Sequence, residues 1–321
     1  MKGLLGEDMN KIVERIERES GVPGLASILA ERLTPTDLQS LLLEVYRLRS
    51  SRRRPADLLS SYESDRFVRP SAVPPSRLLS WEQIAYSQLP PEFQPLALSP
   101  VCPLGTNSVV ATVDQNWSVA TARNTEVVSD STNVLALECA IRRRQLVRAN
   151  RAMEPVHLGA SHRLLRAQRY ESPAALSHFC CFTMCSAGRD EGNSRFELSA
   201  LGQHIRVYLK SLHTFLGPGV PLYVSATDLS STPRNALLET QLLSPIRSEF
   251  ETVDCSVDTL RTGGRGYYLD LCFHIHATHP SGRRLELVDG GSVDWTRRLL
   301  SDAKERLVIS GLGSERLCSE F

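Results

Sequence analysis

The most informative stretch of this sequence is Gly311-Leu312-Gly313-Ser314-Glu315-Arg316-Leu317, near the end of its 321 residues. It follows the apolar run Leu307-Val308-Ile309, so the pattern predicts a strand that breaks into a glycine-rich turn and starts a helix. Glycines there allow the backbone to come close to a ligand, and an arginine at the start of a helix can contact a phosphate or stack on a base. A Gly-x-Gly turn before a helix more often serves packing, so its meaning depends on the segments that precede it.

The composition describes a chain with almost no net charge. Its 37 basic and 36 acidic side chains give a net charge of +1, so no global field draws it to nucleic acid or to a membrane. The eight cysteines form no Cys-x-x-Cys pair, and several lie in apolar runs where a reduced thiol is a small hydrophobe. No signal peptide opens the chain, and no apolar stretch approaches the roughly 20 residues of a membrane span. We therefore expect a cytoplasmic protein.

Composition and proline content divide the chain into three parts. We predict an N-terminal helical module at 1–66, a linker at 67–75 that contains Pro70, Pro74 and Pro75, and a core at 76–321. The module has no obvious basic stripe. This favours the docking of a protein partner over a contact with tRNA.

Hydrophobic periodicity and capping residues predict the elements of both parts. We expect helices at 9–19, 25–33, 35–45, 78–89, 130–141 and 196–215. We expect strands at 93–98, 108–113, 117–123, 156–166, 178–184, 221–226, 267–277 and 285–288, with a turn at Asp114-Gln115-Asn116 that joins the second and third. Strands that neighbour one another through hairpins, with helices interspersed, indicate an α+β fold, in which helices flank an antiparallel β-sheet.

The order of these elements over 76–321 resembles the catalytic core of class II aminoacyl-tRNA synthetases, in the histidyl-tRNA synthetase-like branch. The first motif of that family is a helix and a strand that ends in proline, and it builds a dimer interface. The segments 78–89 and 93–98, with Pro100, are similar to it. The resemblance therefore implies a homodimer.

The second family motif is a pair of strands joined by a loop that holds ATP. In the family, an arginine clamps the α-phosphate and the carboxylate, and a glutamate follows two residues later. The run Leu165-Arg166-Ala167-Gln168-Arg169 resembles this pattern and leads through the loop to His178-Phe179, with Arg163 as an alternative register. Gln168 replaces the glutamate, which keeps a hydrogen-bonding amide but loses the charge.

The third family motif is the opening stretch, Gly311 to Leu317. By resemblance, Gly311 and Gly313 lie close to ATP, Arg316 stacks on adenine or contacts the γ-phosphate, and Glu315 braces Arg316. When a carboxylate attacks the α-phosphate, negative charge builds on phosphorus, so catalysis is positioning plus cationic stabilisation. The planar fork of Arg166 suits that role. Mg²⁺ is implied as the partner of ATP, although carboxylates that would bind it are not obvious.

Two further stretches resemble the family's amino-acid site. Arg123-Asn124-Thr125-Glu126 is similar to its Arg-Pro-Glu element, which implies that Glu126 receives the amino group, and Thr132 supplies a nearby hydroxyl. Arg265-Gly266-Tyr267-Tyr268 is similar to the histidine-recognition strand, and Asp289-Gly290-Gly291 to a downstream Gly-Gly turn. The family has two residues between its Arg-Gly and Tyr-Tyr pairs, and His274 stands where the branch has glutamate. We do not expect histidine to be the substrate.

Three histidines, His274, His276 and His279, raise the question of a metal. Strand alternation puts His274 and His276 on one face, as two ligands require. No cysteine or carboxylate at a convincing spacing completes the set. We therefore predict no metal site here, and a structural or partner-facing role for these histidines.

The resemblance leaves two functions open. In the first, the protein is an adenylate-forming enzyme that binds ATP and Mg²⁺ and activates an amino acid or a related carboxylate. In the second, it is a silent regulatory or scaffold subunit, like the synthetase-like regulatory partner of ATP phosphoribosyltransferase, and the substitutions Gln168 and His274 favour this. The chain stops four residues after Leu317, where a histidyl enzyme carries an anticodon-binding domain. We therefore do not expect ordinary tRNA charging.

Overall fold

The computed structural model describes residues 2–168 and 177–321 and divides the chain into two compact units. One unit comprises Met1–Ser64 with Ala120–Thr125, and the other comprises Asp65–Val119 with Glu126–Phe321. In the part of the chain that is described, no helix has the length and apolar character to cross a bilayer.

The first unit consists of helices joined by turns. They are α1 (Lys2–Ser20), α2 (Leu25–Ser27), a π-helical turn (Ile28–Arg32), α3 (Pro35–Ser50) and α4 (Pro55–Ser64). The predicted start of α3 is confirmed, because the Thr34 hydroxyl accepts a hydrogen bond from the Asp37 amide at 3.2 Å. None of the residues of this unit from Met9 onward is buried. From Met9 onward, the helices therefore enclose no core of their own.

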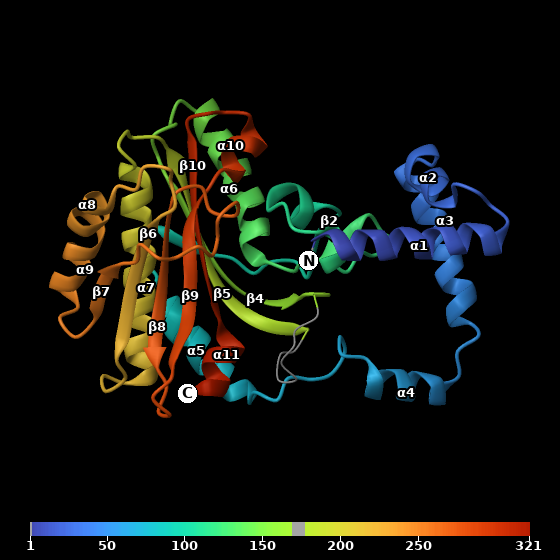
Figure 1. Cartoon of the computed structure of the whole chain (residues 1–321), viewed down its shortest axis with the longest axis horizontal. Coiled ribbons are helices and arrows are strands. Elements are labelled where there is room, and N and C mark those ends of the chain that lie inside the picture. Colours follow the sequence, from blue (N-terminus) through green and yellow to red (C-terminus); the bar gives the residue numbers. More distant parts are fainter. Residues whose placement is uncertain (1, 169–176) are drawn as a thin grey trace. The chain divides into compact units, whose positions relative to one another are not determined.

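The second unit is built on an eight-stranded sheet with the order β1-β4-β5-β10-β9-β8-β6-β7 (Figure 1). Its strands are β1 (Phe93–Pro95), β4 (Val156–Leu165), β5 (His178–Arg189), β6 (Leu222–Asp228), β7 (Asp254–Val257), β8 (Leu271–Thr278), β9 (Arg284–Val293) and β10 (Glu305–Gly313). All central pairs are antiparallel, whereas the edge strands β1 and β7 run parallel to β4 and β6. The predicted sheet is thus confirmed in its centre, and its edges differ.

Helices cover both faces of this sheet (Figure 1). On one face lie α5 (Pro75–Ser87), α7 (Arg195–Leu216) and α11 (Ser314–Glu320), and on the other lie α6 (Ser131–Arg148) and α10 (Trp295–Leu300). Alternate residues of β5 supply the two cores, so Phe182 packs beneath α5 and α7 while Cys185 packs beneath α6. A strand buried on both faces is mostly apolar, as residues 180–185 are apart from Thr183. The Trp81 indole of α5 donates to the Ser314 hydroxyl at 3.0 Å, where α11 begins.

Some predicted elements are wrong. The hairpin expected at 108–123 is replaced by a π-helical turn (Thr106–Val110) and a 3-10 helix (Gln115–Trp117), while β2 (Val101–Pro103) and β3 (Thr125–Val127) form a separate small sheet. Gly290-Gly291 lies inside β9 rather than in a turn. The stretch 227–262, which gave no clear sequence pattern, holds α8 (Asn235–Leu238), a further π-helical turn (Glu239–Leu243), α9 (Ser244–Glu249) and β7.

Candidate functional site

A row of small and polar side chains crosses the α6 face of the sheet and ends in the carboxylate–histidine pair Asp289 and His274. Strand pairing aligns Thr183 of β5 with Gly311 of β10, Gly311 with Asp289 of β9, and Asp289 with His274 of β8. Because Gly311 has no side chain, bare backbone lies between Thr183 and Asp289. This row is where the sequence predicted a close approach of backbone to a ligand.

Arg166 is held beside this row directly after β4. Its Nε donates to the Ser129 carbonyl at 2.9 Å, and its terminal nitrogen lies 3.3 Å from an Asp130 carboxylate oxygen. The guanidinium lies 5.1 Å from the centre of the Phe179 ring. About a third of the side chain is exposed, at 34%. Arg166 is thus an oriented cation that a ligand can still reach.

Asp130 and Thr132 form the start of α6 beneath Arg166. Asp130 caps the helix, because one carboxylate oxygen accepts from the Thr132 amide at 2.9 Å and from its hydroxyl at 2.8 Å. The side chain of Thr132 also lies beside that of Tyr267. Burial raises the pKa of Tyr267 well above its usual value, so this phenol stays neutral and can donate.

Tyr268 and Arg261 surround the Asp289 end of the row. The Arg261 guanidinium donates to Asp289 at 2.9 Å, and His274 Nε2 lies 3.4 Å from the same carboxylate oxygen. Burial alone would raise the pKa of Asp289, but its hydrogen bond to His274 and the charge of Arg261 hold it below the usual range. Asp289 therefore carries a negative charge at neutral pH.

The third motif links α11 to the β4–β5 pair. The buried Glu315 carboxylate lies 2.9 Å from an Arg163 nitrogen and accepts from the Cys180 amide at 3.1 Å. Glu315 was predicted to brace Arg316, and in the structure it pairs with Arg163 instead. Arg316 is exposed, and within the described part of the chain it forms no ion pair. Arg316 is thus a cation without a partner here, next to Gly313.

Glu126 is completely buried and is bound by a different set of groups. Its carboxylate accepts from the Gly105 and Asn107 amides at 3.0 and 2.9 Å, and from the side-chain amides of Asn107 and Gln115 at 2.6 Å each. These bonds fix the loop between β2 and β3. The carboxylate beside Arg166 is Asp130, which the sequence marked only as a helix cap.

The other predicted residues are spread more widely. Arg123 is exposed in the first unit, and Arg265 is exposed and donates to the Leu229 carbonyl at 3.2 Å. The side chain of His178 lies 2.9 Å from Arg163 and also contacts the Arg69 carbonyl. The Gln168 carbonyl accepts from Arg66 at 3.0 Å. The predicted ATP loop at 169–176, with Arg169, lies outside the described residues.

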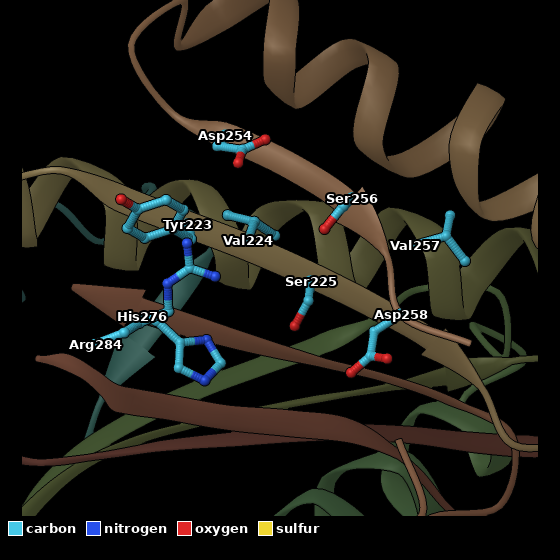
Figure 2. A pocket seen from close by; sticks show the side chains of 9 residues that line it. All are labelled: Tyr223, Val224, Ser225, Asp254, Ser256, Val257, Asp258, His276 and Arg284. Carbon is cyan, nitrogen blue, oxygen red and sulfur yellow. The ribbon is translucent and has the colours of Figure 1, made fainter. Parts of the chain in front are cut away.

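A pocket lies farther along the same face, where β6, β7, β8 and the start of β9 meet. Its lining residues are Tyr223, Val224, Ser225, Asp254, Ser256, Val257, Asp258, His276 and Arg284. Figure 2 shows the Arg284 guanidinium beside Tyr223 and next to the His276 imidazole. The guanidinium carbon of Arg284, Cζ, lies 3.6 Å from the centre of the Tyr223 ring, which places a cation over the aromatic face.

The structure also corrects the reason for excluding a metal. Glu286 and Asp289 of β9 lie opposite His276 and His274 of β8. Carboxylates are therefore present beside both histidines, contrary to the sequence prediction.

Comparison with known proteins shows what this fold resembles. No protein-family model and no curated protein matches the sequence. An ATP phosphoribosyltransferase regulatory subunit/histidyl-tRNA synthetase from Bacillus halodurans is similar in structure, with a TM-score of 0.57 and 10% identity over 80% of this chain and 83% of the other. Apo histidyl-tRNA synthetase from S. aureus gives a TM-score of 0.55 and 14% identity over 78% of this chain and 68% of the other.

A third similar structure is described as the RNA binding domain of threonyl-tRNA synthetase from Cryptosporidium parvum. Its TM-score is 0.54 and its identity 11%, over 76% of this chain and 62% of that one. These likenesses confirm the predicted class II synthetase-like fold. At such identities, they concern the fold alone.

Proposed function

We propose that this protein is a synthetase-like paralogue that binds ATP and activates an amino acid or a related carboxylate as an adenylate. The observation that carries the proposal is the pairing of Arg166 with Asp130 beside the bare backbone of Gly311. A cation and an anion that are both partly exposed at one spot suit a ligand that carries a carboxylate or phosphate as well as an amine.

Each group has a role in this chemistry. The Arg166 fork binds the α-phosphate together with the attacking carboxylate, and the Asp130 carboxylate receives the amino group. Tyr267 and Thr132 line the same spot and supply hydroxyl groups. Arg316 is free to hold the far phosphates of ATP. Catalysis then rests on positioning and on neutralising charge at phosphorus.

Mg²⁺ would accompany ATP and neutralise its phosphates. The described residues beside Gly311 do not form an oxygen-only ligand set for it, because Asp289 is bound by Arg261 and faces His274. We therefore assign no step to a protein-bound Mg²⁺.

Nucleotide binding is tested by thermal unfolding with ATP and MgCl₂. We expect ATP to raise the melting temperature and Arg316→Ala to abolish the shift. Arg148→Ala, which removes an exposed arginine at the other end of α6, is the control and should leave the shift unchanged. If ATP does not stabilise the wild-type protein, the proposal is wrong.

Activation is tested by amino-acid-dependent exchange of pyrophosphate into ATP, across all twenty amino acids. Asp130→Asn keeps a helix cap and so preserves the fold, but it removes the charge beside Arg166. We expect this variant to lose the exchange while it keeps the thermal shift with ATP. Exchange at the wild-type rate in Asp130→Asn would show that Asp130 is not part of the site.

A second function, that of a regulatory or scaffold subunit, is favoured by a specific observation on the first unit. Its helices expose large apolar side chains, namely Met9, Ile12, Ile16, Leu41, Val45, Tyr46, Leu48, Leu58, Leu59 and Tyr62. Such a surface suits a protein partner. A silent subunit would show neither exchange nor a shift with ATP and would co-purify as a stoichiometric complex. Homodimerisation stays a prediction, and light scattering that finds a monomer at micromolar concentration would contradict it.

A further inference from the structure

We propose that His274, His276 and Glu286 form a binding site for a zinc-like divalent cation on strands β8 and β9, on the α6 face of the sheet. The described residues bring one potential ligand atom from each of these side chains to within 4.8 Å of the others. The site consists of these side chains alone, and it does not depend on the binding of a nucleotide.

A β-bulge creates this arrangement. On β8, His274 and His276 are two residues apart and share one face. On β9, their partners Asp289 and Glu286 are three residues apart, which in a regular strand would place them on opposite faces. The irregularity at Ile275 and His276 adds one residue to β9 and brings Glu286 to the histidine face.

The separations suit a metal. Ligand bonds of about 2.0–2.2 Å in a tetrahedron place ligand atoms roughly 3.3–3.6 Å apart. His274 Nε2 lies 3.5 Å from Glu286 Oε2 and 3.4 Å from Asp289 Oδ1. The rings of His274 and His276 are 5.5 Å apart and perpendicular, at 90°. One cation can therefore sit between His274 and Glu286, and His276, whose ligand atom lies within 4.8 Å of theirs, is the third ligand.

The chemistry of the ligands selects the metal. Two imidazoles and one carboxylate suit zinc and its late first-row neighbours, whereas Mg²⁺ prefers an octahedron of oxygens. Asp289 is already bound by Arg261 at 2.9 Å, so Glu286, with 45% of its side chain exposed, is the available carboxylate. Three protein ligands leave a fourth position for water or a small ligand. His276 also lines the pocket with Ser225 and Asp258, which is where such a ligand has room (Figure 2).

The alternative is that His274 pairs only with the carboxylates of Glu286 and Asp289. That arrangement needs no His276 and binds no metal. Substitution of His276 therefore separates the two interpretations.

The test uses the whole 321-residue chain, treated with a chelator and titrated with ZnCl₂ in a calorimeter without nucleotide. We expect one zinc per chain, and a loss of affinity of about tenfold or more in both His276→Gln and Glu286→Gln. His279→Gln is the matched control, because His279 lies beyond β8 and bonds Ser281 at 2.7 Å. This variant should bind zinc as the wild type does.

Two further measurements secure the result. Thermal unfolding of each metal-free variant shows whether it is folded, and only folded variants are compared. Substitution with CoCl₂ should give the visible absorption of a four-coordinate site, while MgCl₂ in excess should not displace zinc. Absence of stoichiometric zinc binding, or equal affinity in the wild type, His276→Gln and Glu286→Gln, would overturn the site.

Discussion

Arg143 and Glu305 form an ion pair in which both side chains are completely shielded from solvent. Two nitrogens of the Arg143 guanidinium each lie 2.9 Å from a carboxylate oxygen of Glu305, so the contact is bidentate. The remaining donors of Arg143 reach the carbonyls of Ala152 and Glu154. This pair fastens α6, whose first turn carries Asp130 and Thr132, to the start of β10.

Removal of one partner should therefore destabilise the fold strongly. We expect Arg143→Met to lower the free energy of unfolding by about 3–5 kcal/mol, because it leaves the Glu305 charge buried with only Arg189 near it, at 3.4 Å. Urea denaturation measures the change. Arg142→Met is the control: Arg142 pairs with Glu138 at the surface, so its loss should cost less than about 1 kcal/mol. Equal effects of the two substitutions would contradict this account.

The carboxylate of Glu126 should also contribute to stability. Both oxygens of this carboxylate accept hydrogen bonds, two each. In Glu126→Gln, an NH₂ group replaces one of these oxygens, so its hydrogens would face the N–H donors that the oxygen bound. We expect a loss of about 1–3 kcal/mol in urea denaturation, with or without ligand. Glu138→Gln, at the surface, should change stability by less than about 0.5 kcal/mol. An unchanged stability of Glu126→Gln, together with weaker binding of an amino acid, would instead support the binding role predicted from the sequence.

The centre of the sheet could be predicted from the sequence because local signals and tertiary packing agree there. Leu307 to Ile309 with the following glycines predicts β10 and the start of α11, and both exist. Around Glu126 they disagree. The buried carboxylate of Glu126 accepts hydrogen bonds from the backbone amides of Gly105 and Asn107, and this loop takes the place of the expected hairpin. No local sequence pattern predicts such a contact.

The candidate site shows the same limit. The sequence singled out Arg166, Thr132 and Tyr267, and the structure brings these three together. It missed Asp130 because a helix cap and a ligand-binding carboxylate look alike in a sequence. It missed Glu286 because the bulge on β9 changes which face that side chain occupies, and simple alternation does not predict a bulge.

Gly291 should be intolerant of any side chain. An added Cβ would lie 2.6 Å from a ring carbon of Tyr268 and 2.7 Å from the Leu271 carbonyl oxygen. The backbone of β8 cannot move away, so we expect Gly291→Ala to cost about 1–3 kcal/mol or more in thermal unfolding. Gly219→Ala is the control, since nothing lies within 4 Å of its added Cβ, and its stability should change by less than about 0.5 kcal/mol. A stable Gly291→Ala would mean that Tyr268 and the Leu271 carbonyl do not lie this close to Gly291.

The buried imidazole of His204 should make stability depend on pH. His204 lies between the hydroxyls of Ser186 and Ser310, at 2.9 and 2.8 Å, and is fully buried. Burial, with a smaller contribution from the charge of His157, lowers the pKa of His204 to about 3. An unfolded histidine titrates near pH 6.5, so between about pH 6.5 and 3 the unfolded chain binds the extra proton.

Stability should therefore fall as the pH decreases through that window, by up to about 1.4 kcal/mol per pH unit from this group. His204→Gln removes the titration, and we expect its free energy of unfolding, measured in urea from pH 7 to 4, to decrease less steeply than that of the wild type. His279→Gln, which removes a histidine outside the core, should keep the wild-type slope. If His204→Gln and the wild type show parallel curves, the imidazole of His204 is not held neutral between the two serines.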